Sequence, residues 1–325
     1  MPPSRFAKRP NAVSLAVVAA HLGFVFAPIY LAAVIAPSPW LVALWVWFGL
    51  GMNGLLNLMH EASHFHVFHE RWANDLLGGW ILGPLTLADF DGYRLRHWDH
   101  HRRLGEPDDP KVTYHLDVRG HHMVSLLLRC LFLVEAVRKF RHQAELPDAG
   151  EPAPGSSLTW VARTLLVHAL FAGSIMAPAW LAHGRSAMAS VFTAALAYDC
   201  VYVYGLASLT VFAASLRAIA EHQIGPDGAP HVGQAALRNF TCNPFTRLVL
   251  GAYGFGEHAT HHEIPGIPYY RLEKASLELA EKNAAFAPTY SYWSTLWTLV
   301  HPRNAASTPE HEAPKKKGFI RVFRG

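Results

Sequence analysis

The sequence is poor in charged residues and in cysteine. Charged side chains make up 16% of the 325 residues and hydrophobic ones 51%, a balance that is unusual for a soluble globular protein. The three cysteines, Cys130, Cys200 and Cys242, lie far apart without a CxxC pair, which excludes a disulfide framework and a cysteine-bound iron–sulfur cluster. No basic recognition motif accompanies the net charge of +4, so we expect no nucleic-acid partner.

Long hydrophobic runs take the place of the missing charge. Four are long enough to cross a hydrocarbon core of about 30 Å, and they comprise residues 13–36, 40–59, 158–182 and 187–216. Short turns join the first to the second and the third to the fourth, which predicts two transmembrane hairpins with both termini on one side. A shorter apolar run, residues 76–87, is expected to dip into the bilayer or lie on its surface, and another, residues 123–137, is expected to form an interfacial helix.

Lysine and arginine are distributed unevenly between the two sides of this predicted bundle. The two far turns contain only Arg185, whereas the near side holds almost all the other basic residues, so the near side is predicted to be cytoplasmic. We therefore predict an all-α integral protein of the cell inner membrane, with four transmembrane helices in two hairpins, interfacial helices and a cytoplasmic histidine-rich cap. We expect one domain, residues 1–325, with its core at about residues 13–272; residues 273–325 form a cytoplasmic C-terminal region with a basic tail.

Eight of the 21 histidines fall into three short clusters. The first, HxxxH, contains His60 and His64, which project from one face of a helix because they are four residues apart. The other two are HxxHH clusters with the same spacing. They contain His97, His100 and His101, and His258, His261 and His262.

All three clusters are expected on the same face of the membrane, where the hairpins bring the chain back. Buried imidazoles are costly unless they are hydrogen-bonded or bind a metal, so a packing role does not explain eight of them. Eight ligands exceed what one ion accepts, which predicts two metal ions. Imidazole suits iron, copper, zinc and nickel, and the spacing leaves the choice of metal open.

The order of the clusters resembles the membrane fatty-acid desaturase and hydroxylase superfamily, whose members carry an HxxxH, an HxxHH and a further HxxHH box. The flanking residues are similar too: 74–78 after the first box, Tyr93 and Arg94 before the second, and 261–272 around the third. The resemblance covers roughly residues 52–272. It implies that the histidines hold two non-haem irons, which activate O2 to remove hydrogen from an unactivated C–H bond of a lipid chain.

The same resemblance adds a ninth ligand and a partner. Arg217, Glu221 and His222 look like the family's Arg-x-x-x-Glu-His segment, in which the histidine is a further iron ligand. Electrons are expected from a separate ferredoxin, rubredoxin or cytochrome, because the chain shows neither a GxGxxG motif after a strand nor a fused cytochrome b5 motif. A basic surface is a candidate to dock that donor: Arg102, Arg103, Arg138, Lys139 and Arg141.

Desaturation of an acyl lipid is the favoured activity, and hydroxylation or ketolation of a lipid, alkane, sphingoid base or carotenoid is the alternative. Two more remote alternatives remain. Residues 60–64 are also a literal HExxH, the motif of a zinc intramembrane protease, although this leaves both HxxHH boxes unexplained. A metal transporter is disfavoured because the predicted spans offer few mid-membrane ligands: His21, His168 and Asp199.

Four acidic residues near the boxes are candidates to orient the ligand imidazoles, with ordinary solvated carboxylates as the alternative reading. They are Asp99, Glu221, Glu257 and Glu263. His66 and His69, which follow the first box, are expected to be hydrogen-bonded interfacial histidines and not ligands.

Overall fold

The computed structural model describes residues 9–106, 108–110, 122–145, 156–184, 186–222, 236–288 and 290–300. Within these residues every regular element is a helix, and strand-like pairing is limited to two isolated bridges. Residues 146–155, Arg185 and the basic tail lie outside the described residues. The all-α prediction is confirmed.

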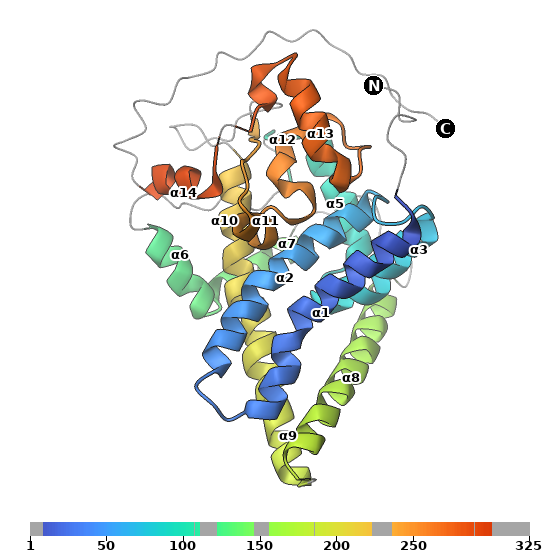
Figure 1. Ribbon diagram of the computed structural model, residues 1–325, viewed down its shortest axis with the longest axis vertical. Helices are drawn as coiled ribbons and strands as arrows, with labels where there is room; N and C mark the ends of the chain where they lie inside the picture. The colour runs from blue at the N-terminus through green and yellow to red at the C-terminus, as the bar shows by residue number, and fades with distance from the viewer. Residues whose placement is uncertain are drawn as a thin grey trace.

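Four helices are long and apolar enough to cross a membrane. The first two are α1 (Asn11–Ile35) and α2 (Leu41–Ser63), and the third is α8 (Ser156–Ala182). The fourth is continuous from residue 187 to 221 and consists of α9 (Ala187–Leu196), the π-helical segments η4 (Ala197–Val203) and η5 (Leu206–Thr210), and α10 (Val211–Glu221). Figure 1 shows α1 beside α2 and α8 meeting α9, the two hairpins predicted from the sequence.

The fourth helix runs five residues beyond the predicted end at Leu216. The hydropathy falls there because Arg217 and Glu221 follow, but these two side chains form an ion pair with atoms 3.1 Å apart, and Glu221 is fully buried. Paired charges one helical turn apart are compatible with a continuing helix. The helix therefore ends at the residue before His222.

The spans pack around an aromatic centre and expose apolar side chains outward. Phe26, Phe48 and Tyr202 contact one another in the middle of the bundle, and Phe171 of α8 joins them. The outer face of α8 carries exposed leucines, and only 17% of the most apolar stretch of this helix is buried. Exposed leucine on this scale fits a surface that contacts lipid.

Shorter helices cover the end of the bundle at which both hairpins open (Figure 1). The first of them follow α2 as α3 (Arg71–Leu76), η2 (Leu77–Leu82), α4 (Gly83–Leu85) and α5 (Phe90–Arg102). After α10 come α11 (Pro244–Val249), η7 (Ala252–Glu257), α12 (His258–Glu263), α13 (Tyr269–Ala280), η8 (Ala284–Phe286) and α14 (Tyr292–Val300).

The two short apolar runs fold differently. Residues 76–87 form η2 and α4, which pack against α2 and α8 and do not cross the bundle, as expected for a segment that dips into the bilayer. Residues 123–137 do not form one helix. The chain breaks at Leu133, whose φ of 60° is left-handed, and gives α6 (His122–Leu131) and α7 (Val134–Glu145).

Asn74 holds the loop that connects the first histidine box to α3. Its side-chain oxygen accepts hydrogen bonds from the backbone N–H groups of Val67 and Phe68, at 3.0 and 3.2 Å, and its amide donates to the carbonyls of Phe68 and Glu70. The side chain is fully buried. Nearby, Gly78 allows α5 to approach, because a Cβ there would lie 2.1 Å from the ring of Phe90.

We predict that Asn74→Ala lowers the thermal unfolding midpoint of the detergent-purified protein. The substitution leaves backbone groups of the loop without partners, at a cost of about 1–3 kcal/mol for each buried group. Asp75→Ala is the matched control, because it removes only a surface ion pair with Arg94, worth about 0–1 kcal/mol. Equal midpoints for the two variants would contradict the anchoring role.

Candidate metal centre

The first histidine box lies at the end of the second span. His60 is in the last turns of α2 and His64 caps its C-terminus, and both side chains are buried. The hydroxyl of Ser63 donates to the carbonyl of His60 at 2.6 Å, which satisfies one of the free carbonyls at the helix end. The box therefore projects into the protein at the membrane surface.

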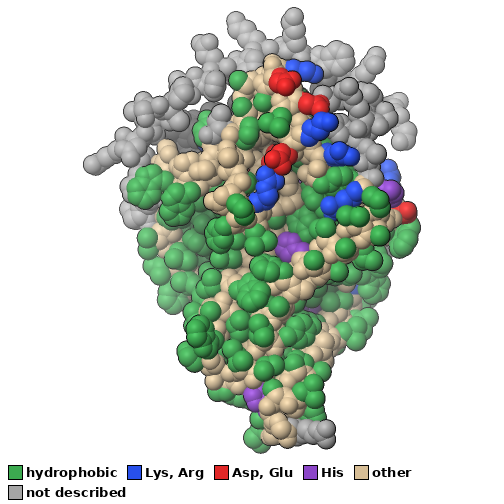
Figure 2. All heavy atoms as spheres, in the orientation of Figure 1, with side chains coloured by type: hydrophobic (Ala, Val, Ile, Leu, Met, Phe, Trp, Pro, Cys, Tyr) green, Lys and Arg blue, Asp and Glu red, His purple; other side chains and the backbone are tan. Residues whose placement is uncertain are grey.

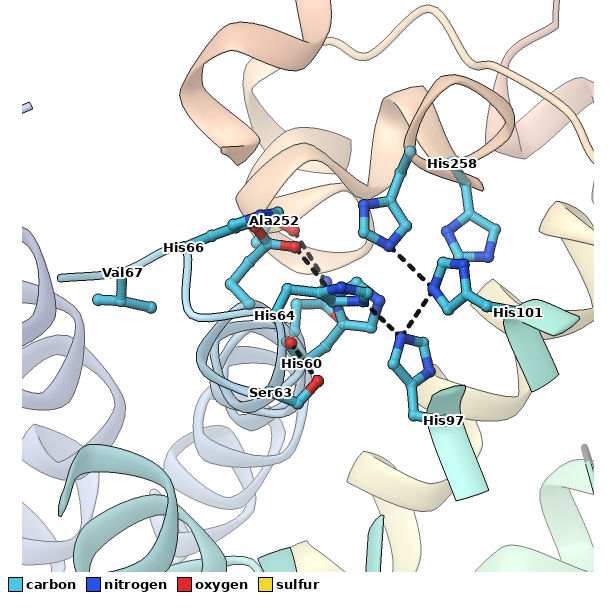
Figure 3. A network of polar contacts seen from close by, with 12 residues as sticks. His60, Ser63, His64, His66, Val67, His97, His101, Ala252 and His258 are labelled. Carbon is cyan, nitrogen blue, oxygen red and sulfur yellow. Dashed lines mark hydrogen bonds and ion pairs between the residues drawn. The ribbon is translucent and has the colours of Figure 1, made fainter. Parts of the chain in front are cut away.

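The second box lies on α5, a helix capped by Asp89, whose carboxylate accepts the N–H of Gly92 at 3.2 Å. This helix brings His97 against the first box, with Nε2 of His97 2.7 Å from Nε2 of His64. Nε2 of His101 lies 2.9 Å from Nε2 of His97. Three imidazole nitrogens thus meet around one point (Figure 3).

The third box forms the short helix α12. It follows a tight reversal in which Tyr253 and Gly254 both have left-handed backbone angles, with φ of 55° and 77°. Such a conformation is costly for tyrosine, and here the Tyr253 ring stacks on His21 of α1 and its hydroxyl lies 2.7 Å from His21 Nδ1. The reversal turns α12 toward the other boxes, where Nε2 of His261 lies 3.3 Å from Nε2 of His101.

The nine predicted ligands divide into two neighbouring groups. In the first group one nitrogen from each of five histidines lies within 4.8 Å of all the others: His60, His64, His97, His101 and His261. Figure 3 shows four of these rings turned toward one another: His60, His64, His97 and His101. Metal–nitrogen bonds of about 2.0–2.1 Å require nitrogens about 3 Å apart, which the separations in this group approach.

The second group lies beside the first. Glu221, His222 and His258 present ligand atoms within 4.8 Å of one another, and all three are buried. The rings of His100 and His262 border them: the His100 centroid lies 5.2 Å from that of His222, and the His262 centroid 4.7 Å from that of His258. The two groups touch where His101 stacks on His262, with ring centroids 4.0 Å apart.

The chemistry of these side chains fits metal ions. Nε2 of His60, Nδ1 of His64 and both ring nitrogens of His262 are buried without a hydrogen-bond partner among the described residues. Burial, reinforced by the neighbouring imidazoles, lowers the pKa of His64, His97 and His262 well below the usual range. These rings are therefore neutral at pH 7, the state in which imidazole donates a lone pair to a metal.

Comparison with known proteins agrees with this arrangement. The sequence model of the family described as fatty acid desaturase matches residues 37–294, which include all nine histidines. The chain belongs to the fatty acid desaturase family. Membership explains why the three boxes occur in this order, and the resemblance stated from the sequence is confirmed.

Two curated relatives of this desaturase-family chain are lipid desaturases. An sn-1 oleoyl-lipid 12-desaturase from Anabaena variabilis is 30% identical over 82 residues, which are 25% of this chain and 23% of the relative. Another, from Picosynechococcus sp., is 32% identical over 79 residues, 24% of this chain and 22% of the relative. The matched stretch spans less than a quarter of each of these relatives.

Two carboxylates that contact box histidines were not assigned an orienting role from the sequence. Both oxygens of Asp109 lie 2.9 Å from Nδ1 of His100, and Glu61 Oε1 lies 2.9 Å from Nδ1 of His60. A carboxylate that accepts a hydrogen bond from Nδ1 fixes the ring and leaves Nε2 available to a metal. Glu61 also contacts His66, with atoms 3.4 Å apart, and His66 belongs to neither group of candidate ligands.

Of the four carboxylates that were proposed to orient ligands, Glu221 lies close to a box histidine. Its Oε2 is 3.8 Å from Nε2 of His258. Asp99 pairs with Arg102, Glu257 faces Arg247 at 3.7 Å, and Glu263 is exposed. The signal for Asp109 was the Asp108–Asp109 pair just beyond the second box, but only the folded loop shows which of the two faces His100.

We predict that Asp109→Asn lowers the affinity for Fe(II) by about 10–100-fold, the usual effect of losing a carboxylate behind a metal-bound histidine. The amide keeps the shape of the side chain but removes the charge that holds His100. Asp108→Asn is the control, because its exposed carboxylate pairs with Arg103 at 2.7 Å. Chelator competition on the metal-depleted protein measures both, and equal affinities would contradict the role of Asp109.

Proposed function

We propose that the protein is an O2-dependent di-iron oxidoreductase that introduces a double bond into the acyl chain of a membrane lipid. The observation that carries the proposal is the convergence of three histidine boxes into two adjacent groups at one end of the membrane spans. Membership in the desaturase family and the desaturase activity for which the two relatives are named support the same reaction class.

The two groups define which residues would hold the metals. One iron would be bound by the five histidines of the first group, and the other by His100, His222, His258 and His262, with Glu221 beside them. Iron is proposed because C–H oxidation by O2 requires a redox-active metal, which zinc is not. Bound iron would supply activation of O2, while Asp109 and Glu61 keep His100 and His60 oriented toward it.

The position of the groups favours a lipid substrate. The first box continues α2 and His222 follows α10, so both groups lie where two spans leave the bilayer. An acyl chain that remains in the membrane can approach this level without entering water. We therefore propose an acyl lipid, with hydroxylation or ketolation of a lipid, alkane, sphingoid base or carotenoid as the alternative outcome at the same site.

Desaturation also requires an external electron donor. The two hydrogens removed from the chain supply two of the four electrons that reduce O2 to water, so a ferredoxin, rubredoxin or cytochrome is proposed to supply the other two. The basic docking surface is smaller than the sequence indicated. Lys139 is withdrawn from it, because its amine bonds to Ser215 at 2.9 Å and burial lowers its pKa, whereas Arg102 and Arg138 are exposed.

The distribution of basic residues supports a cytoplasmic position for this face. The exposed arginines on α5 and α7 lie at the end of the molecule that carries the histidines. We propose that the four helices span the inner membrane of a cell and that both termini and the metal centre face its cytoplasm.

The geometry disfavours the two remote alternatives. A zinc protease needs Glu61 as a general base, but both of its oxygens contact histidines, His60 and His66. A transporter needs ligands within the spans, but His21 bonds to Tyr253, and His168 bonds to Tyr198 and to the carbonyl of Pro84.

We predict that the purified protein binds two irons per chain and that His261→Ala and His100→Ala each lower this content. His261 belongs to the first group and His100 to the second, so the double variant is expected to lose nearly all iron. His69→Ala, an exposed histidine outside both groups, is the control. Metal analysis of membrane-inserted protein checks this; stoichiometric zinc without iron would support the protease instead.

We predict that cells expressing the active protein accumulate a lipid with a new double bond that is missing from cells expressing His261→Ala. Lipid mass spectrometry with double-bond localisation identifies the product and its position. A hydroxylated or ketonic product would assign the alternative activity, and identical lipids in all strains, with iron-loaded protein present, would contradict the proposal.

A further inference from the structure

Helix α14 is uncharged and turns two tryptophans outward. Its nine residues, Tyr292–Val300, include no charged side chain. Trp293 is 74% exposed and Trp297 is 52% exposed, and their spacing of four places them on one face of the helix. Tyr292 and Leu296, on the adjoining face, are buried. Tryptophan pairs of this kind are typical of the membrane–water interface, where one part of the ring is apolar and the N–H reaches water.

The packing of α14 places it at the end of the fourth span. Leu296 and Tyr292 belong to one apolar cluster with Ala220 of α10, and Leu216 of the same span packs against that cluster. Figure 1 shows α14 beside α10 and directed away from the bundle. In Figure 2 the hydrophobic side chains over this region adjoin the hydrophobic surface of the spans. The level of α14 is therefore that of the membrane surface.

The elements next to α14 carry the same kind of surface. On α11, Phe245 is 64% exposed and Leu248 is 42% exposed. This helix is tied to the second span, because the amide of Asn53 donates to the carbonyl of Val249 at 2.7 Å. Asn53 lies ten residues before the end of α2 at Ser63, which is about 15 Å along the helix axis. Exposed apolar side chains this far from the end of the span fit a surface that contacts lipid.

Helix α6 borders α14 from the other side. Its Met123 packs against the cluster that contains Leu296, while Val124, Leu128 and the following Phe132 are exposed by 61%, 47% and 77%. The outward apolar face of α14 is thus continued by the outward faces of its neighbours.

We propose that α14 lies in the headgroup layer of the bilayer, on the side that carries the histidines, with Trp293 and Trp297 turned toward lipid. The partner is the lipid surface itself, because the exposed face joins the lipid-facing surface of the spans without a charged residue in the helix. This attachment does not depend on the proposed reaction, since it requires only that the four helices cross a membrane.

Helix α14 also contacts the second histidine group through Tyr292. Tyr292 stacks on Phe240, with ring centroids 4.0 Å apart, and its hydroxyl lies 3.0 Å from a carboxylate oxygen of Glu221. The other oxygen of Glu221 lies 3.8 Å from His258. Tyr292 thus connects the tryptophan-bearing helix to the carboxylate beside His222 and His258.

The test uses the full chain in lipid nanodiscs and compares wild type with the double variant Trp293→Phe and Trp297→Phe. The difference between the two emission spectra isolates these tryptophans from the other eight in the chain. Phospholipids brominated near the ester groups are expected to quench most of this difference emission. The Trp180→Phe difference is the positive control, because Trp180 lies near the end of the third span and is 39% exposed.

Two results would overturn the proposal. Difference emission that bromolipid leaves unchanged but aqueous acrylamide quenches would place α14 in water. Emission shielded from both quenchers would show that protein covers the face, either a second copy or the electron donor. The phenylalanine variants retain an aromatic ring at each site, so equal iron content in wild type and variant confirms that the fold is intact.

Discussion

The structure depends on the requirement that many imidazoles share one buried volume without carrying charge. Each ring loses its hydrogen bonds to water when it is buried, and it then needs another partner. A buried polar nitrogen without a partner costs about 1–3 kcal/mol. Protonation would bring like charges within hydrogen-bond distance, as between His64 and His97. Neutral rings that bind shared cations would avoid both costs. The hairpins, α5 and α12 are arranged so that this volume forms where the spans end.

Much of this architecture could be read from the sequence, because long apolar runs have few alternatives to membrane helices. The end of the fourth span could not, since Arg217 and Glu221 read as a solvated boundary and pair instead inside the protein. The break at Leu133 was also hidden, because apolar periodicity continues through it and nothing in the residue type favours a left-handed backbone. Tertiary packing overrides local preference at both places.

The spacing of the boxes predicted convergence on two ions but not which histidines belong to each group. Adjacent residues on a helix differ by about 100° in direction, so His100 and His101 of one box point to different groups, as do His261 and His262. An HxxHH sequence therefore serves two metals from one helix, a consequence of helix geometry that the motif contains. The partner of His100 is different in kind: Asp109 reaches it through a loop whose path only the fold determines.

The fourth helix has a length that matters beyond the centre itself. Its 35 residues span about 50 Å at 1.5 Å per residue, whereas the hydrocarbon core is about 30 Å thick. The fourth helix is therefore longer than the hydrocarbon core is thick, and its end places His222 outside the lipid. A thinner or thicker bilayer changes the tilt of a spanning helix. It would therefore change the distance between His222 and the histidine boxes.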